Sequence, residues 1–178
     1  VLKENGTDLR KEIVGDNYMD INDRIYGNNV LLTLNSEINT MVAGIIAGKR
    51  GVEGHNSPIA ENAQIMNLVV SAESGEPYLK DMALAIRYAV DNGAKIINMS
   101  FGKQTSPDAD MVEDAIHYAA NHDVLLVMAS GNNGTDCDKK IYYPQGLDKT
   151  GKRIDNLIRV GASDINGNPG SISNYGKN

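Results

Sequence analysis

The chain of 178 residues is poor in cysteine and in long apolar runs. Its single cysteine, Cys137, excludes an internal disulfide, provides no cysteine cluster for a metal ion and leaves the redox compartment open. No apolar run approaches the roughly 20 residues that a membrane-spanning helix needs. The sequence therefore predicts no membrane partner.

Basic and aromatic residues are also scarce. Lys and Arg number 17 against 23 Asp and Glu, and aromatic residues make up 5% of the chain. A surface that binds nucleic acid usually gathers basic side chains on one face, whereas these are scattered along the sequence. We predict no nucleic-acid partner and favour a peptide or a small molecule.

The start of the chain lacks the features of a secretory signal. Val1 is followed neither by a basic region nor by an apolar stretch. We expect the sequence to be an excerpt of a longer protein, with a length that suits one domain or part of one. Residues 1–29 are polar and are predicted to form a surface segment, while residues 30–178 are expected to form an α/β core.

From residue 64 onward, short apolar runs alternate with helical periodicity. The apolar runs predict strands over residues 64–70, 94–99, 124–129 and 157–162, with another strand starting at 172–175. The periodic segments predict helices over residues 78–91, ended by Asn92 and Gly93, and over residues 108–121. This alternation is typical of a parallel sheet covered by helices and joined by right-handed crossovers.

Another helix is predicted before this core. Residues 41–47 are small and apolar throughout, which is typical of a helix that is buried on all sides. We expect Asn39 or Thr40 to cap its N-terminus.

Two predicted strands end in residues suited to binding. Ser100, Phe101 and Gly102 follow one strand, and residues 131–134 (GNNG) follow the next. Ligands of parallel sheets bind at this carboxyl edge, where the amide of Asn132 could stabilise the oxyanion of an acyl-transfer reaction. A plain turn remains the alternative for GNNG. A phosphate site is disfavoured because no helix and no Gly-Lys-Ser/Thr ending follow.

Three motifs of this chain occur in an order and spacing known from one family. They are residues 38–44 (INTMVAG), 96–102 (IINMSFG) and 129–134 (ASGNNG). Together they resemble subtilisin-like serine peptidases, and residues 158–162 and 171–176 extend the likeness. The resemblance implies an incomplete three-layer subtilisin-like α/β fold, with a mostly parallel sheet flanked by helices, and residues 1–178 as a partial peptidase domain. It also implies peptide-bond hydrolysis through an acyl-enzyme.

The resemblance further implies roles for single residues. Asn132 would be the oxyanion-hole asparagine, and Ser100, Phe101 and Gly102 would pair with an extended peptide or protein substrate. The primary specificity pocket would be bordered by Ala129, Ser130 and Gly131, with Tyr143 and Pro144 on its far wall. An extracytoplasmic or secreted location follows from the resemblance alone.

The first motif departs from the family at its catalytic position. Ile38 stands where the family has its general-base histidine, and an isoleucine side chain cannot accept a proton. We do not expect His55, His117 or His122 to replace it, because one lies in a Gly-rich loop and two lie on or just after a helix. The Asp-Ser/Thr-Gly motif is not found, and the Gly-Thr-Ser motif is expected beyond Asn178. The chain as given is therefore predicted to be inactive.

Two alternative functions stay open. The chain could be a peptide-binding pseudoprotease, or, less favoured, a nucleotide-binding doubly wound domain, although it lacks the Gly-rich turn after a first strand.

No cofactor is predicted. Calcium is an open alternative at residues 164–170, where the sixth-position Gly and the distal Glu are missing, so a tight loop is favoured. For Asp16, Asp20, Asn22 and Asp23 a solvated acidic face is favoured over a cation site.

Overall fold

A parallel sheet of three strands organises the structure, a computed structural model that describes residues 10–30, 36–51, 57–71, 78–104 and 109–177. The elements are α2 (Ser36–Ala47), α3 (Leu79–Asp91), β1 (Ile96–Met99), α4 (Ala109–Ala120), β2 (Leu125–Ala129) and β3 (Leu157–Val160). The strands lie in the order β1-β2-β3, and both pairings are parallel. Helices combined with a parallel sheet confirm the predicted incomplete α/β fold.

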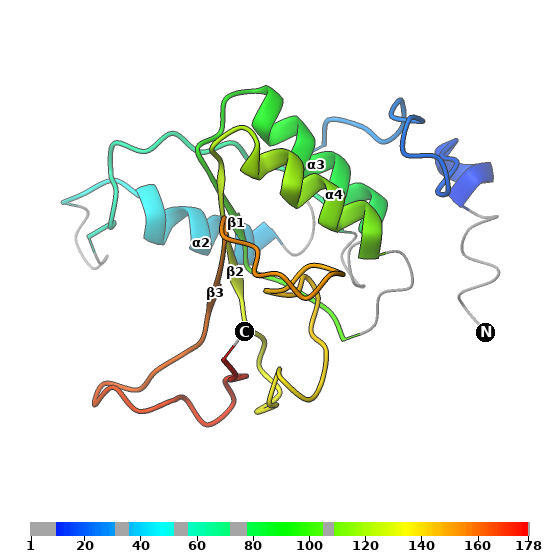
Figure 1. Cartoon of the computed structure of the whole chain (residues 1–178). Helices are drawn as coiled ribbons and strands as arrows, with labels where there is room; N and C mark the ends of the chain where they lie inside the picture. The colour runs from blue at the N-terminus through cyan, green and yellow to red at the C-terminus, as the bar shows by residue number, and fades with distance from the viewer. Residues whose placement is uncertain (1–9, 31–35, 52–56, 72–77, 105–108, 178) are drawn as a thin grey trace.

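The core lies between the sheet and the helices α3 and α4, which run together along one side of the strands (Figure 1). Met99 pairs with Met128 and Leu126 pairs with Leu157, so their side chains share one face of the sheet. All four side chains are buried in the core that α3 and α4 share. On the opposite face, Ile96, Ile158 and Val160 are about half exposed or more.

The predicted strand–helix alternation is confirmed from residue 79 onward. Helix α3 ends at the expected stop, because Gly93 has a positive φ of 85° and its N–H donates to Val90 O at 3.0 Å. Its apolar residues recur every three or four positions and are buried, which is the face that the sequence pattern predicted. Helix α4 and strands β2 and β3 follow within a few residues of their expected positions.

Two predicted strands are wrong. Residues 64–70 are not a strand, and Ile65 and Met66 are exposed, because none of the three described strands pairs with this segment. An apolar run becomes a strand only where a neighbour takes up its backbone hydrogen bonds. Residues 172–175 form only an isolated bridge between Tyr175 and Asp136, since the backbone there bonds to the loop after β2 instead.

Helix α2 is present, but the predictions of its burial and its cap are wrong. It begins at Ser36, so Asn39 and Thr40 lie inside the helix rather than at its cap. Ile38, Met41 and Ile45 are each 60% exposed. An all-apolar helix is buried only if another surface packs on it, and the described residues do not surround α2. No helix in this described part is both long and apolar enough to cross a membrane.

A buried group of charged residues joins the N-terminal segment to α3. The carboxylate of Asp16 forms ion pairs with Arg10 and with Lys80, and the Asp16 and Lys80 side chains are completely buried. Arg10 also contacts Asp81 at 2.5 Å, and Tyr26 donates a hydrogen bond to Asp81 at 2.6 Å. Buried charges persist only when paired. The hypothesis of a solvated acidic face is therefore wrong for Asp16.

Candidate substrate-binding site

The predicted binding residues gather at the carboxyl ends of β1 and β2. The pairing of Met99 with Met128 brings Ser100 and Ala129 to the same edge of the sheet. Ser130 continues the ladder, because its N–H donates to Val160 O at 2.9 Å. We call the residues that leave these two strands the strand-end edge: Ser100, Phe101, Gly102, Ser130, Gly131 and Asn132.

The first half of the strand-end edge is extended and partly open. Ser100 is exposed, and its Oγ accepts a hydrogen bond from Asn98 Nδ2 at 2.9 Å. Beyond the half-buried Phe101 and Gly102, Lys103 exchanges two backbone hydrogen bonds with Tyr143, of 3.1 and 2.7 Å. This pairing fixes residues 100–102 relative to the wall formed by residues 142–144.

Asn174 holds the second half of the strand-end edge. Its side-chain Nδ2 donates to Ser130 O at 2.9 Å, and its Oδ1 accepts from the N–H groups of Asn133 and Thr135 at 2.9 and 3.0 Å. The Asn174 backbone N–H also donates to Gly131 O at 2.8 Å. Asn174 is only 3% exposed, so these bonds are shielded from water.

Asn132 lies on this loop with its side chain exposed. Gly131, just before it, has a φ of 103°, a conformation that strongly favours glycine. A Cβ there would also lie 2.4 Å from Asn174 Nδ2. The loop is therefore a built turn that presents an exposed amide at the carboxyl edge of the sheet. The Asn132 amide can therefore donate a hydrogen bond to a carbonyl or carboxylate oxygen of a ligand.

Residues 142–144 form the wall between the two halves. Pro144 is buried, and the ring of Tyr142 packs against the core. The same ring lies against both glycines of the strand-end edge: a Cβ on Gly102 would be 2.4 Å from Tyr142 Cε1, and one on Gly131 would be 2.8 Å from Tyr142 Cζ. The two glycines thus permit the tyrosine to sit between the strand ends.

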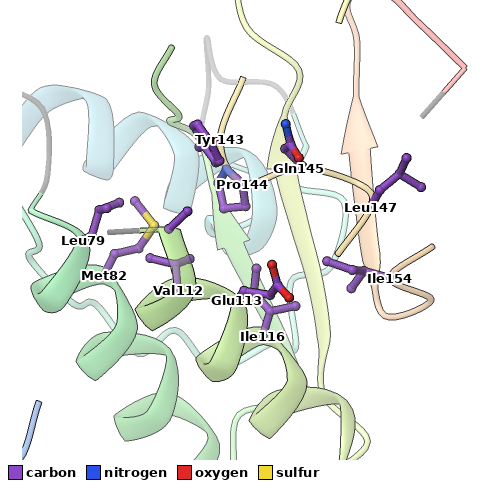
Figure 2. Close-up of a pocket in the computed structure, with 11 residues that line it drawn as sticks. Leu79, Met82, Val112, Glu113, Ile116, Tyr143, Pro144, Gln145, Leu147 and Ile154 are labelled. Atoms are coloured by element: carbon purple, nitrogen blue, oxygen red, sulfur yellow. The ribbon is translucent and has the colours of Figure 1, made fainter. Parts of the chain in front are cut away.

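A small cavity of about 30 Å³ adjoins this wall (Figure 2). Leu79 and Met82 of α3, and Val112 and Ile116 of α4, face Tyr143 and Pro144 across it. The walls are mainly apolar, with Glu113 and Gln145 as the charged and amide residues among them, so the cavity suits a small apolar group. Sequence reasoning assigned the helical residues only to the core, because periodicity cannot distinguish a core contact from a cavity wall.

The described histidines lie away from the strand-end edge. His117 is in the last turn of α4, and His122 follows that helix, so both precede the amino end of β2 while the site lies at its carboxyl end. His117 Nε2 is 3.8 Å from Glu113, and a ring nitrogen of His122 is 2.8 Å from Tyr118 O. His55 lies outside the described residues.

The sequence-predicted position Ile38 lies in the first turn of α2, with its side chain exposed. Its side chain offers neither a lone pair nor an exchangeable proton. The hydrogen bonds of Asn174 that shape the strand-end edge were not predicted from the sequence. The partners of Asn174 lie about 40 positions earlier in the chain, so no local spacing could reveal the network.

The acidic loop at residues 164–170 is a tight turn. The Asp164 carboxylate accepts hydrogen bonds from the backbone N–H groups of Asn166 and Asn168 and from the Asn168 side chain. The side-chain bond to Asn168 and then the backbone bonds lower the pKa of Asp164. Within the described residues, no group of three or more His, Cys, Asp or Glu side chains is placed to hold a metal ion.

Comparisons with known proteins match the chain to one family. The model of the subtilase family (peptidase S8) matches residues 39–178, beginning one residue after Ile38. A thermophilic serine proteinase of Bacillus sp. (strain AK1) is 34% identical over 137 residues, which are 77% of this chain and 31% of the relative. Subtilisin Savinase of Lederbergia lenta is 36% identical over 140 residues, which are 77% of this chain and 46% of the relative.

Solved structures show the same likeness. The maturation protease PagA for prenylagaramide matches with a TM-score of 0.65 and 32% identity, covering 76% of this chain and 46% of PagA. The patellamide maturation protease PatA matches with a TM-score of 0.64 and 30% identity, covering 83% of this chain and 53% of PatA. The chain thus spans about a third to a half of the length of these relatives. On the family match and this structural likeness, the chain belongs to the subtilase family of subtilisin-like serine peptidases.

Proposed function

We propose that this chain provides the peptide-binding edge of a subtilisin-like serine peptidase domain and is itself unable to catalyse hydrolysis. The observation that carries the proposal is the strand-end edge, where an extended segment and an exposed asparagine amide lie at neighbouring strand ends. A peptide would lie extended along Ser100, Phe101 and Gly102. Its carbonyl oxygen would accept a hydrogen bond from Asn132.

The binding chemistry follows from this arrangement. An extended peptide gains affinity mainly from backbone hydrogen bonds to a strand edge, and side-chain pockets select its sequence. Asn132 sits on a loop whose shape Asn174 fixes, so its amide dipole needs little reorganisation to meet developing negative charge. Ala129, Ser130 and Gly131 border the pocket for one substrate side chain, and Pro144 belongs to the opposite wall.

The proposed lack of hydrolysis rests on Ile38. In this proposal Ile38 occupies the general-base position of the family motif, and its aliphatic side chain cannot remove a proton from a serine hydroxyl. An oxyanion site and substrate binding alone still accelerate reactions about 10³- to 10⁴-fold over water, which is far below ordinary protease activity.

A second candidate function is peptide capture without turnover, as in a pseudoprotease. The observation that favours it is the combination of a strand-end edge shaped by the hydrogen bonds of Asn174 with an apolar residue at position 38. An extracytoplasmic location belongs to the same proposal. One relative carries the name minor extracellular protease Epr, of Bacillus subtilis (strain 168).

Calorimetric titration with tetra-alanine tests the binding proposal. The terminal carboxylate of this peptide can accept a charge-assisted hydrogen bond from the Asn132 amide, so we expect Asn132→Ala to weaken binding by about 10-fold or more. The matched control is Asn166→Ala, an exposed asparagine in the 164–170 turn outside the strand-end edge, which should leave the affinity unchanged. Equal affinity for all three proteins would remove Asn132 from the site. No binding heat for any of them would contradict the proposed function.

Labelling with a fluorophosphonate probe tests the proposed inactivity. In the longest natural form of the protein, we expect negligible labelling of the native sequence. If the rest of the catalytic machinery is present, Ile38→His should raise it. Strong labelling of the native protein would show that Ile38 does not occupy the general-base position.

A further inference from the structure

We propose that Tyr142 fills the primary specificity pocket of this chain and restricts it to the smallest side chains, glycine and alanine. The inference rests on the proposed function, since it assigns the pocket to the space between the two halves of the strand-end edge. It adds a residue that neither the motifs nor the wall at Tyr143 and Pro144 indicated.

The ring of Tyr142 stands edge-on between the two strand ends. A Cβ built on Gly102 would lie 2.4 Å from Cε1 and 2.9 Å from Cζ of Tyr142. A Cβ built on Gly131 would lie 2.8 Å from Cζ and 3.0 Å from Cε2 of the same ring. The two ring edges near the hydroxyl therefore face the two glycines. The ring occupies the space that a side chain would enter from a peptide bound along residues 100–102.

The backbone around Tyr142 keeps the ring in this position. Its neighbour Tyr143 exchanges two backbone hydrogen bonds with Lys103, and Pro144 is buried against α3 and α4 (Figure 2). Tyr142 itself packs against the core. A large substrate side chain could enter only by displacing a ring that packs against the core, whereas a hydrogen atom or a methyl group requires little displacement.

The glycines support this reading from the opposite side. Gly102 adopts no conformation that requires glycine, so the close approach of the Tyr142 ring and of Tyr143 O at 2.8 Å explains why a side chain is absent there. At Gly131 the positive φ already favours glycine, and the ring adds a second reason. The space between the strands is therefore filled by this chain's own tyrosine.

Peptides that differ in one side chain test the inference. We would measure the binding of tetra-alanine and of Ala-Ala-Ala-Phe by competition in fluorescence polarisation, with a labelled tetra-alanine as the tracer. The native protein should bind tetra-alanine at least about 10-fold more tightly than the Phe peptide, since side-chain pockets discriminate by such factors. Tyr142→Ala should reverse this preference, and Tyr142→Leu should give an intermediate ratio. The matched control Tyr88→Ala removes an exposed tyrosine of α3 and should leave the ratio unchanged.

The outcomes separate the inference from the proposed function. If the tracer binds but the Ala-to-Phe ratio is the same in the native protein and in both Tyr142 variants, the inference is overturned and peptide binding stands. A native preference for Phe also overturns it. If the tracer binds neither the native protein nor any variant, the proposed function fails and the inference fails with it. Should Tyr142→Ala not fold, as shown by circular dichroism, Tyr142→Leu alone decides the result.

Discussion

The strand-end edge and helix α2 contain the two parts of the proposed site, and their residues are held very differently. Beside the strand-end edge, Asn174 is 3% exposed and makes five hydrogen bonds to the loop after β2. On α2, Ile38, Met41 and Ile45 are each 60% exposed. The edge is a specific hydrogen-bonded structure, whereas α2 is an apolar helix open to solvent.

The difference indicates which positions can change without loss of structure. A change in the Asn174 network would leave buried backbone groups without partners, which costs free energy in every folded molecule. A change at Ile38 removes nothing on which the described structure depends. The hydrogen bonds around the strand-end edge therefore constrain its sequence, whereas the fold leaves residue 38 free to vary.

Asn174→Ala should produce the largest effect. The variant leaves the N–H groups of Asn133 and Thr135 and the carbonyl of Ser130 without their partner, so we expect the free energy of unfolding to fall by about 3 kcal/mol. Urea denaturation measures it. Asn168→Ala, which removes a hydrogen bond of an exposed turn, is the matched control and should cost well under half as much. Equal losses would mean that the strand-end edge is held no more tightly than a surface turn.

Gly131→Ala should come next and can be separated into strain and clash. Gly131 and Gly151 both have positive φ, but a Cβ at Gly151 meets nothing within 4 Å, whereas one at Gly131 meets Asn174 and the Tyr142 ring. We expect Gly151→Ala to cost about 1 kcal/mol from backbone strain, and Gly131→Ala to cost about 2 kcal/mol or more. Thermal unfolding compares the two. Similar losses would argue that the loop has room around Gly131.

A pH dependence should reveal the other tightly packed polar group, the one that joins the N-terminal segment to α3. Burial, and then the hydrogen bond to Asp81, raise the pKa of Tyr26 above its ordinary value of 10.0. A raised pKa gives stability that is complete below pH 10 and is lost as the pH rises above it, because the unfolded state releases the proton first. The denaturation midpoint should therefore fall above pH 10.

Tyr26→Phe isolates this contribution. The variant should lose part of that alkaline decrease, while Tyr88→Phe, at an exposed position on α3, should retain it in full. An unchanged pH profile in Tyr26→Phe would show that the contact with Asp81 does not persist in solution.

Substitutions on α2 should have the smallest effect. Because the Ile38 side chain is 60% exposed, we expect Ile38→Ala and Ile38→His each to change the free energy of unfolding by less than about 0.5 kcal/mol. The measurement is urea denaturation under the conditions used for Asn174→Ala. A loss of 2 kcal/mol or more would mean that Ile38 is packed in solution, and the contrast between the two regions would disappear.

The sequence predicted those features that depend on neighbouring residues. The apolar spacing of α3, its stop at Gly93 and the order of β1, α4 and β2 all follow from local patterns, and the structure confirms them. The predictions that failed needed knowledge of a partner. Residues 64–70 lack a paired strand among the described residues, and the described residues do not cover α2. Asp16 is buried because it forms ion pairs with Arg10 and Lys80.

The site shows the same limit. Ser100 and Asn132 could be proposed from the sequence because each follows an apolar strand within a short motif. The network of Asn174 and the ring of Tyr142 could not be predicted, because their contacts are far away in the sequence. Ser130 lies 44 positions from Asn174, and Gly131 and Gly102 lie 11 and 40 positions from Tyr142. Only folding brings the walls of the site together.

Titration of isotope-labelled protein with tetra-alanine, followed by the backbone amide signals, tests the central claim most directly. We predict that the signals of Ser100, Phe101, Gly102 and Asn132 move in proportion to bound peptide, while that of Ile38 does not and no cleavage product forms. Unchanged signals at the strand-end edge at saturating peptide, or release of alanine fragments by the native chain, would contradict the account.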